Sequence, residues 1–566
     1  MPWRLLAGCW LLVLVSHCSS LLAGGVPTIY GWDNETLDNQ WGTALNWTTD
    51  VVPGQSDPTI ERILLASSSA DGPQTIDLGG VERDILRMEA TSVDMTGGGY
   101  AFQNGTLEIH QTVGNAILTS GTETSFTFNA DADIQFAPAS VDPRFNVVAG
   151  AGKITVNGNV APSPASTGVT TLELTSRDLT LRPSILISGV ISDGTNPNAQ
   201  LALRAGFATD SVNHRGIVRL TGDNTYSGPT SVSGATLEFS SIADADGSPS
   251  ALGAPNNATD GTIRLGAVDT NVAADPNDNI DVSGTLWYAG SGGSGHSSNR
   301  DFELIGSGGV LHAGRTATGG LTLSGNVTAT SASDKVLELS GHSSHANAMT
   351  GAISDGAGEI ELLKTGSTEW RLSGALNYTG DTRVVGGSLI FDGASLSTNA
   401  DLEVGDAGQS GTVRLQNLAH MSTKEAQIGL CFSSDCTGSV GSVTIDESTF
   451  ETEGLRLGQD DGDGTLNVDN GSRLVTTSFA LVGIDGGTGV VNVTGPTSRW
   501  DASGGDIDLG AISGAGTVNV TGGGVLEHTG GDVVLGSDNF TEGTAGGMLL
   551  VQGSESRFDT TGELRL

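Results

Sequence analysis

The sequence predicts an all-β chain folded as a parallel β-solenoid, in which each turn, or rung, holds about 25 residues and three short strands. Three observations lead to this prediction. Glycine supplies 84 of the 566 residues, about twice its average share, without the Gly-X-Y period of collagen. Apolar and polar residues alternate in short runs, as in half-buried strands. These runs recur at a regular interval, which indicates a repeat architecture.

The repeat is clearest over residues 411–566. Each line of the repeat has three parts, which are Gly-x-V-x-V, an apolar residue about ten positions further on, and L-x-L-G. Successive lines begin roughly 23 to 31 residues apart, an interval typical of repeat architectures. The opening residues are Gly411, Gly441, Gly464, Gly489, Gly516 and Gly547.

Apolar residues fill equivalent positions in these lines. The first strand carries a pair spaced by two: Val443/Ile445, Leu466/Val468, Val491/Val493, Val518/Val520 and Leu549/Val551. The middle position holds Phe450, Leu474, Trp500, Leu526 and Phe558, and the third holds Leu455/Leu457, Leu481, Ile507/Leu509, Val533/Leu535 and Leu564/Leu566. One rung cannot bury such an edge, whereas stacked rungs form a continuous core. An antiparallel sandwich would need hairpins, and a propeller blade about 40 residues, so both fit less well.

The charge balance argues against two classes of partner. The chain has 64 Asp and Glu residues against 25 Lys and Arg residues, a net charge of −39 and a pI near 4.2. Nucleic-acid binding needs clustered basic side chains, and an anionic lipid surface would repel the chain. We therefore expect neither nucleic acid nor an acidic membrane surface as a partner.

The N-terminus has the layout of a signal peptide, predicted over residues 1–24. Arg4 precedes an apolar run over residues 5–15, and small residues follow it,. No later stretch approaches the length of an apolar membrane span, so we expect no transmembrane helix in the mature chain. The mature chain keeps Cys431 and Cys436. In an oxidising compartment they are expected to form a disulfide, since one pair without nearby His is too few ligands for a metal.

Different parts of the chain resemble two repeat families. Residues 411–566 resemble a bacterial repeat shared by type V-secreted and PEP-CTERM-sorted surface proteins, through the signatures G-T-V-x-V-x-G-x-x-S-x-W and L-x-L-G. Residues 216–239 and 358–393 resemble the autotransporter-associated β-strand repeat. The second copy contains Lys364-Thr365-Gly366, Leu372-Ser373-Gly374, Asn377-Tyr378-Thr379-Gly380 and Gly387-x-Leu389; the first contains Asn224-Thr225-Tyr226-Ser227-Gly228 but lacks Lys-Thr-Gly. Each follows a similar phrase, SGVISDG ending at Gly194 and TGAISDG ending at Gly356.

The resemblance implies a right-handed parallel β-helix that is secreted or displayed on the bacterial surface, like an autotransporter passenger, and is adhesive or structural. It supplies no catalytic residue and no cofactor. The predicted organisation is a signal peptide (1–24), a Trp-rich leader or cap (25–60), a solenoid with repeats at about 188–239 and 351–393 (61–410), and regular rungs (411–566). The sequence stops inside a rung with no barrel or sorting tail, so we expect a truncated chain or a cap from a partner.

Three asparagines are the candidate binding residues. Asn467, Asn492 and Asn519 stand between the paired apolar residues of successive rungs, so we expect them to point outward at one stacked position,. They are interpreted either as a flat strip that binds a glycan or polymer, or as an amide ladder that only joins the rungs.

Charged side chains give weaker candidates. Asp461 and Asp463 could hold calcium, although the loop is not an EF-hand because Gln459 and Asn470 stand where acidic ligands belong,. Otherwise no metal site is predicted: His342 and His345 have a spacing that a metal accepts, but no third ligand follows, which favours a surface turn. A cationic row for an acidic saccharide is a further hypothesis, but acids two residues further on favour local ion pairs; the row would contain Arg473, Arg499 and Arg557, and the acids are Asp501 and Asp559.

These features predict a non-enzymatic scaffold, exported and adhesin-like, whose partners are a glycan or a host or extracellular-matrix surface. A passive spacer without a ligand is the second hypothesis. The alternative is a β-helix polysaccharide lyase or glycoside hydrolase, which would need clustered carboxylates on one face. Asp506 and Asp508 project to the same side of their strand, but the repeat places no further catalytic group beside them.

Overall fold

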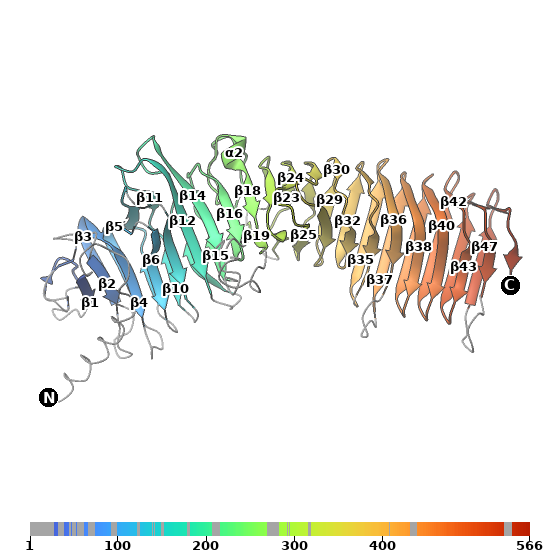
Figure 1. Ribbon diagram of the computed structural model, residues 1–566, viewed down its shortest axis with the longest axis horizontal. Helices are drawn as coiled ribbons and strands as arrows, with labels where there is room; N and C mark the ends of the chain where they lie inside the picture. The colour runs from blue at the N-terminus through green and yellow to red at the C-terminus, as the bar shows by residue number, and fades with distance from the viewer. Residues whose placement is uncertain are drawn as a thin grey trace, which may run out of the picture.

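The computed structural model shows an elongated stack of short strands that runs from β1 near the N-terminus to β47 near the C-terminus (Figure 1). It describes residues 28–31, 39–44, 47, 52–53, 61–65, 74–91, 99–111, 113–120, 125–138, 140, 142–148, 152–177, 182–206, 216–268, 282–290, 293, 295–314, 318–406, 408–430, 438–536 and 546–566. The predicted signal peptide and the pair Cys431 and Cys436 lie outside these residues.

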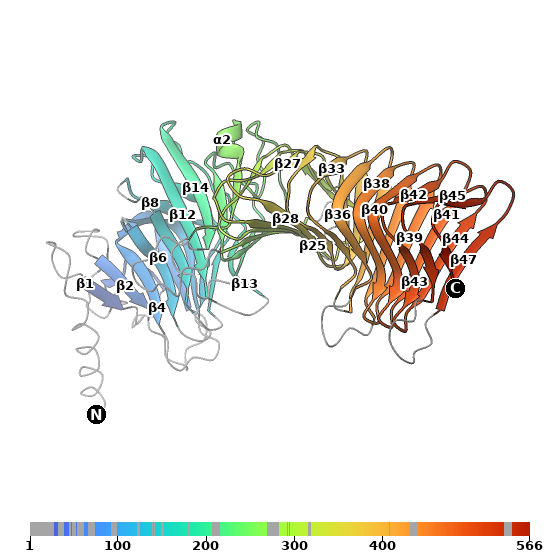
Figure 2. The same ribbon diagram turned by 45° about the vertical axis from the view of Figure 1, so that its right-hand side comes forward.

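The strands form three sheets along the stack, which Figure 2 shows from a second side. The N-terminal sheet has 13 strands: β1 (Thr28–Gly31), β2 (Glu61–Leu65), β4 (Arg87–Thr91), β6 (Val113–Ser120), β9 (Asp142–Val147), β12 (Gly168–Ser176), β14 (Ala199–Gly206), β16 (Thr230–Ser233), β18 (Ile263–Leu265), β21 (Phe302–Leu304), β24 (Val327–Ala329), β27 (Ile353–Ser354) and β30 (Leu376–Asn377). The C-terminal sheet has 11: β20 (His296–Ser298), β23 (Leu321–Leu323), β26 (Asn347–Met349), β29 (Glu369–Leu372), β32 (Gly387–Asp392), β35 (Ser410–Gln416), β37 (Val440–Asp446), β39 (Asp463–Asp469), β41 (Thr488–Thr494), β44 (Ala515–Thr521) and β47 (Gly546–Gln552).

The long sheet follows the whole stack. It has 25 strands: β3 (Gln74–Ile85), β5 (Gly99–Ile109), β7 (Ser125–Phe128), β8 (Ala132–Phe136), β10 (Lys153–Val156), β11 (Val160–Pro162), β13 (Pro183–Ile187), β15 (Ile217–Leu220), β17 (Thr236–Phe239), β19 (Gly284–Tyr288), β22 (Gly308–Ala313), β25 (Lys335–Gly341), β28 (Ile360–Lys364), β31 (Thr382–Val384), β33 (Ser395–Ser397), β34 (Leu402–Val404), β36 (His420–Ile428), β38 (Thr449–Gln459), β40 (Arg473–Ile484), β42 (Arg499–Ser503), β43 (Ile507–Ala511), β45 (Val525–Thr529), β46 (Val533–Leu535), β48 (Arg557–Thr560) and β49 (Leu564–Arg565). One short helix, α2 (Ala258–Gly261), is capped by Asn257. Among the described residues, no helix is long and apolar enough to cross a bilayer.

Successive turns pair in parallel, which confirms the predicted parallel β-solenoid. In the C-terminal sheet the glycines that open the repeat lines pair directly with one another, in the order Gly411, Gly441, Gly464, Gly489, Gly516 and Gly547. The apolar pairs beside the first five glycines are buried, and one continuous cluster of buried side chains follows the stack from Tyr30 to Val533. In the last line the predicted core residues differ: Leu549 and Phe558 are partly buried, and Val551, Leu564 and Leu566 are exposed. The core therefore results from stacking, because no single turn encloses it.

The number of strands in a turn varies along the stack. From β18 to β32 each turn gives one strand to each of the three sheets. In β38 and β40 the predicted middle and third strands are one continuous strand. They separate into β42 and β43 where Gly504, at φ +101°, and Gly505 follow Ser503. Glycine adopts this left-handed conformation readily, and the strand is interrupted at Gly504, whereas Thr477 and Ser478 at the equivalent place continue it.

The assignment of Leu481 to the core was wrong by one residue. Ala480 and Val482 point inward and pair with Ile507 and Leu509, whereas Leu481 points outward beside Asp508. In each line the residue immediately before the closing glycine points inward. In this line that residue is Val482, which precedes Gly483, so the larger side chain of Leu481 lies on the outward face,.

Two tryptophans of the predicted leader pack into the end of the core. Trp41 and Trp47 are fully buried, with ring centroids 4.7 Å apart in an edge-on arrangement. The indole N–H of Trp47 donates to the carbonyl of Trp41 at 2.9 Å, and that of Trp41 to the carbonyl of Pro53 at 3.3 Å. The polar edges of both rings are thus satisfied beside the first turns.

Candidate functional site

The three predicted asparagines form an amide ladder on the C-terminal sheet. Asn467, Asn492 and Asn519 pair in register on β39, β41 and β44. The amide of Asn492 donates to Asn467 Oδ1 at 2.8 Å, and that of Asn519 donates to Asn492 Oδ1 at 2.9 Å. Asn467 donates in turn to the hydroxyl of Thr444 at 3.4 Å. The ladder joins neighbouring rungs, and each of the three asparagines remains partly exposed.

The three arginines of the predicted cationic row pair with acids. Arg473 Nε lies 2.6 Å from Asp501, and Arg557 Nε lies 2.6 Å from Asp559. Arg499 contacts both Asp501 and Glu527, and the Asp501 hydrogen bond raises its pKa. The expected pairing with an acid two residues further on is confirmed for Arg499 and Arg557, whereas Arg473 pairs with Asp501 of the next rung. These exposed pairs contribute little stability.

The sequence also singled out two acidic pairs, Asp461 with Asp463 and Asp506 with Asp508. Within the part of the chain that the structure describes, Asp461 and Asp463 belong to no group of three or more metal-ligating side chains within 4.8 Å. Asp506 Oδ1 accepts the backbone N–H of Asp532 at 2.8 Å, which ties this carboxylate to the next rung. Burial and the nearby Asp506 charge raise the pKa of Asp508.

The described contacts of His342 and His345 involve different residues. The imidazole of His342 lies near His312, with ring centroids 6.0 Å apart, and its Nδ1 is 3.4 Å from the hydroxyl of Ser367. The backbone N–H of His345 donates to the hydroxyl of Ser343 at 3.1 Å. The imidazole of His342 thus contacts residues of the adjacent turns.

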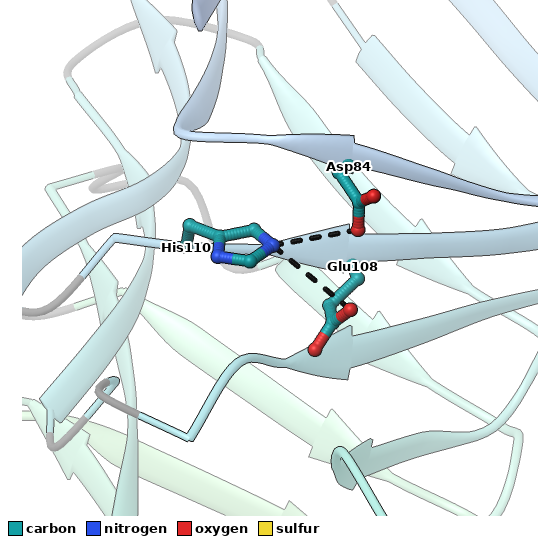
Figure 3. Close-up of side chains that lie close together, drawn as sticks. All are labelled: Asp84, Glu108 and His110. Atoms are coloured by element: carbon teal, nitrogen blue, oxygen red, sulfur yellow. Dashed lines mark hydrogen bonds and ion pairs between the residues drawn. The ribbon is translucent and has the colours of Figure 1, made fainter. Parts of the chain in front are cut away.

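A cluster that the sequence did not reveal lies on the outward face of the long sheet (Figure 3). It consists of Asp84 on β3, Glu108 on β5 and His110, which directly follows β5. Asp84 and Glu108 are register partners on adjacent strands. His110 Nε2 lies 3.4 Å from Asp84 Oδ1 and 3.9 Å from Glu108 Oε2. All three side chains are partly buried.

Negative charge is crowded in this cluster. Burial, the Glu82 carboxylate and a hydrogen bond with Asp84 raise the pKa of Glu108 to about 7, while a hydrogen bond from Ser163 opposes them. Among the described residues, neither Asp84 nor Glu108 pairs with a Lys or Arg. Sequence reasoning had only a weak signal for this cluster, because the two carboxylates belong to different turns and follow no motif.

Both segments that resemble the autotransporter-associated repeat have the same kind of hydrogen bond between turns. In the first copy the Asp193 carboxylate accepts the backbone N–H groups of Leu201 and Ser227 at 2.7 and 3.1 Å. In the second copy Asp355 accepts from the Ile360 N–H at 2.8 Å and the Thr379 hydroxyl at 2.6 Å. The Asp-Gly phrase and the later Tyr-Ser/Thr-Gly segment are therefore joined by a hydrogen bond. The aspartate of the phrase accepts it, and the Ser or Thr of the later segment donates it.

Buried tyrosines repeat the same contact in both copies. The hydroxyl of Tyr226 lies 2.8 Å from that of Thr230, and the hydroxyl of Tyr378 lies 2.8 Å from that of Thr382. All four side chains are fully buried, and burial raises the pKa of both tyrosines, that of Tyr226 to about 12. The hydroxyls satisfy each other inside the core.

Lys364 occupies a buried position in the second copy. Its Nζ donates to three backbone carbonyls, those of Thr365 at 2.7 Å, Gly366 at 3.1 Å and Gly386 at 2.8 Å. Burial lowers the pKa of Lys364 to about 7, and Glu338 opposes this shift. The lysine therefore ties two consecutive turns together through carbonyls at their corners.

Replacing Asp355 by Ala is expected to lower the free energy of unfolding by about 2 kcal/mol, because the N–H of the buried residue Ile360 loses its acceptor. Chemical denaturation followed by circular dichroism measures the change. Asp334→Ala is the matched control, since Asp334 is exposed and no hydrogen bond of its side chain is described. Equal effects of the two substitutions would contradict a role of Asp355 in joining the turns.

Comparison with known proteins agrees with this architecture. A family described as passenger-associated-transport-repeat matches residues 216–239 and 362–391. The adhesin BmaC autotransporter of Brucella suis biovar 1 (strain 1330) is 29% identical over 368 residues, which cover 56% of this chain and 10% of that protein. The chain thus corresponds to about a tenth of the length of this relative. No solved structure matches the chain significantly. Two transport repeats within a parallel β-solenoid make the chain an autotransporter-passenger-like β-helix protein.

Proposed function

We propose that the chain is an exported, surface-displayed scaffold that mediates adhesion and carries no catalytic activity. The observation that carries the proposal is the similarity to an autotransporter adhesin, combined with two transport repeats in the same chain. The mechanism is geometric. A continuous core makes the stack stiff. Each turn adds one side chain to a polar row on the outward face, so a ligand can contact several equivalent groups at once.

The amide ladder is the proposed contact surface, and a neutral glycan or an extracellular-matrix component is the proposed ligand. Asn467, Asn492 and Asn519 present donors and acceptors at the spacing of successive strands, about 4.8 Å,. Amides suit a neutral polar ligand because they offer both kinds of group without a charge. The strong negative charge of the whole chain would repel an acidic polymer.

The absence of catalysis is supported by the use of the acidic side chains. Asp506, the best catalytic candidate from the sequence, accepts a backbone N–H of the next rung. A carboxylate held in this way stabilises the stack and is poorly placed to transfer a proton.

Binding of the purified chain to glycan arrays and to matrix-coated surfaces tests the proposal. We expect binding to fall at least tenfold when the three asparagines are replaced by Ser. In the matched control, Ala replaces Thr465 and Thr517, which lie on strands of the ladder but outside its row. If neither the unsubstituted chain nor the control variant binds, the chain is a passive spacer. Release of unsaturated sugars that is lost in Asp506→Ala or Asp508→Ala would indicate a lyase.

A further inference from the structure

The cluster of Asp84, Glu108 and His110 has the arrangement of a three-ligand metal site. One ligand atom from each side chain lies within 4.8 Å of the other two. Strand pairing between β3 and β5 places Asp84 beside Glu108, and alternation along β5 brings His110 to the same face as Glu108,. In Figure 3 the imidazole Nε2 points toward both carboxylates. A cation between them would contact one atom of each group after small rotations of the side chains.

We propose that Asp84, Glu108 and His110 bind a first-row divalent transition metal, with Zn²⁺ as the expected ion. Two carboxylates and one imidazole are ligands that Zn²⁺ accepts, and three protein ligands leave one position for water. Mg²⁺ and Ca²⁺ prefer oxygen ligands alone, so the imidazole selects against them.

A second, independent observation supports the site. Gln135 on β8 is the register partner of Glu108 on the following turn, and its Oε1 is buried without a hydrogen-bond donor. Buried amide oxygens are nearly always satisfied. A metal-bound water, or the metal itself, would supply the missing partner in the row formed by Asp84, Glu108 and Gln135.

The surroundings also contain a support for one ligand. A hydrogen bond links the hydroxyl of Ser163, a buried residue that directly follows β11, to Glu108. Hydrogen bonds of this kind fix the orientation of a ligating carboxylate. With ligands on adjacent turns, the ion would connect the first turns of the long sheet, β3 and β5, near the N-terminal end of the stack (Figure 1).

Calorimetric titration of the purified chain with Zn²⁺ tests the proposal. We expect one site that His110→Ala weakens about 100-fold and Glu108→Gln weakens at least tenfold. His420→Ala is the matched control and should leave this site unchanged. His420 Nε2 lies 3.7 Å from Glu451 Oε1 on the same sheet, and among the described residues this pair has no third ligand. Unchanged Zn²⁺ stoichiometry and affinity in His110→Ala would overturn the proposal.

Two measurements on the unsubstituted chain make the test independent of variant folding. Co²⁺ bound at the site should give visible absorption bands of a nitrogen- and oxygen-ligated ion, and Zn²⁺ should displace it. A 100-fold excess of Ca²⁺ or Mg²⁺ should leave the Zn²⁺ titration unchanged. Displacement of Zn²⁺ by either ion would overturn the assignment to a transition metal. Circular dichroism of each variant confirms that it retains the β-solenoid.

Discussion

The substitution Val493→Asp is expected to unfold the rungs around β41 and to lower the free energy of unfolding by about 4 kcal/mol or more, because a carboxylate in the core would have no cation and no hydrogen-bond donor. Val493 is fully buried and stacks between Val468 and Val520 of the adjacent turns. Urea denaturation of the variant and of the unsubstituted chain measures the loss.

The effect should be local along the stack. In a solenoid each turn contacts only its neighbours, so damage spreads through adjacent interfaces and fades with distance. Hydrogen exchange should show lost protection in β39, β41 and β44, whereas β12 and β14 should keep theirs. Loss of protection over the whole chain at once would contradict the nearest-neighbour description.

Asn492→Ser on the same strand is the matched control. Asn492 points outward and makes one ladder bond to each neighbour. Serine keeps a hydroxyl but cannot span both contacts, so we expect a loss of about 1 kcal/mol. The difference between the two substitutions separates the inward from the outward face of β41.

The regular rungs could be predicted from the sequence because glycine marks their corners. The glycines that open successive lines pair with one another, so the spacing in the sequence equals the register in the structure. The error at Leu481 shows the limit of this reasoning. Where a small inward residue such as Ala480 adjoins a larger outward one, apolar size alone suggests the wrong face.

Turn length varies more outside residues 411–566 than within them, so the sequence shows no uniform interval there. In the long sheet Gln74 pairs with Tyr100, whereas Thr236 pairs with Thr285, so the second of these turns is nearly twice as long as the first. Insertions at the corners change the spacing without changing the stack.

The cluster of Asp84, Glu108 and His110 could not be predicted from the sequence. Its members come from two turns, and the sequence carries no signature of their meeting. The amide ladder, in contrast, could be predicted, because its three asparagines occur at one position of a visible repeat.

The substitution Gly483→Ala is expected to lower the free energy of unfolding by about 3 kcal/mol or more, although it adds a single methyl group. Gly483 closes a repeat line with φ +70°. A Cβ there would overlap the carbonyl oxygen of Ala515 on the next turn. The next turn would have to move away, which breaks the strand pairing on both sides of this corner.

Gly234→Ala separates the two causes of this loss. Gly234 has a similar φ of +65°, but no heavy atom lies within 4 Å of its added Cβ. This substitution therefore measures the strain of the left-handed backbone alone, about 1 kcal/mol. Thermal or urea denaturation of both variants should show the larger loss for Gly483→Ala. Equal losses would mean that backbone conformation alone selects glycine at the corners. A larger loss for Gly483→Ala would mean that the close stacking of the turns also selects it. Such selection explains why the closing glycine recurs at the same position beside the core in successive lines.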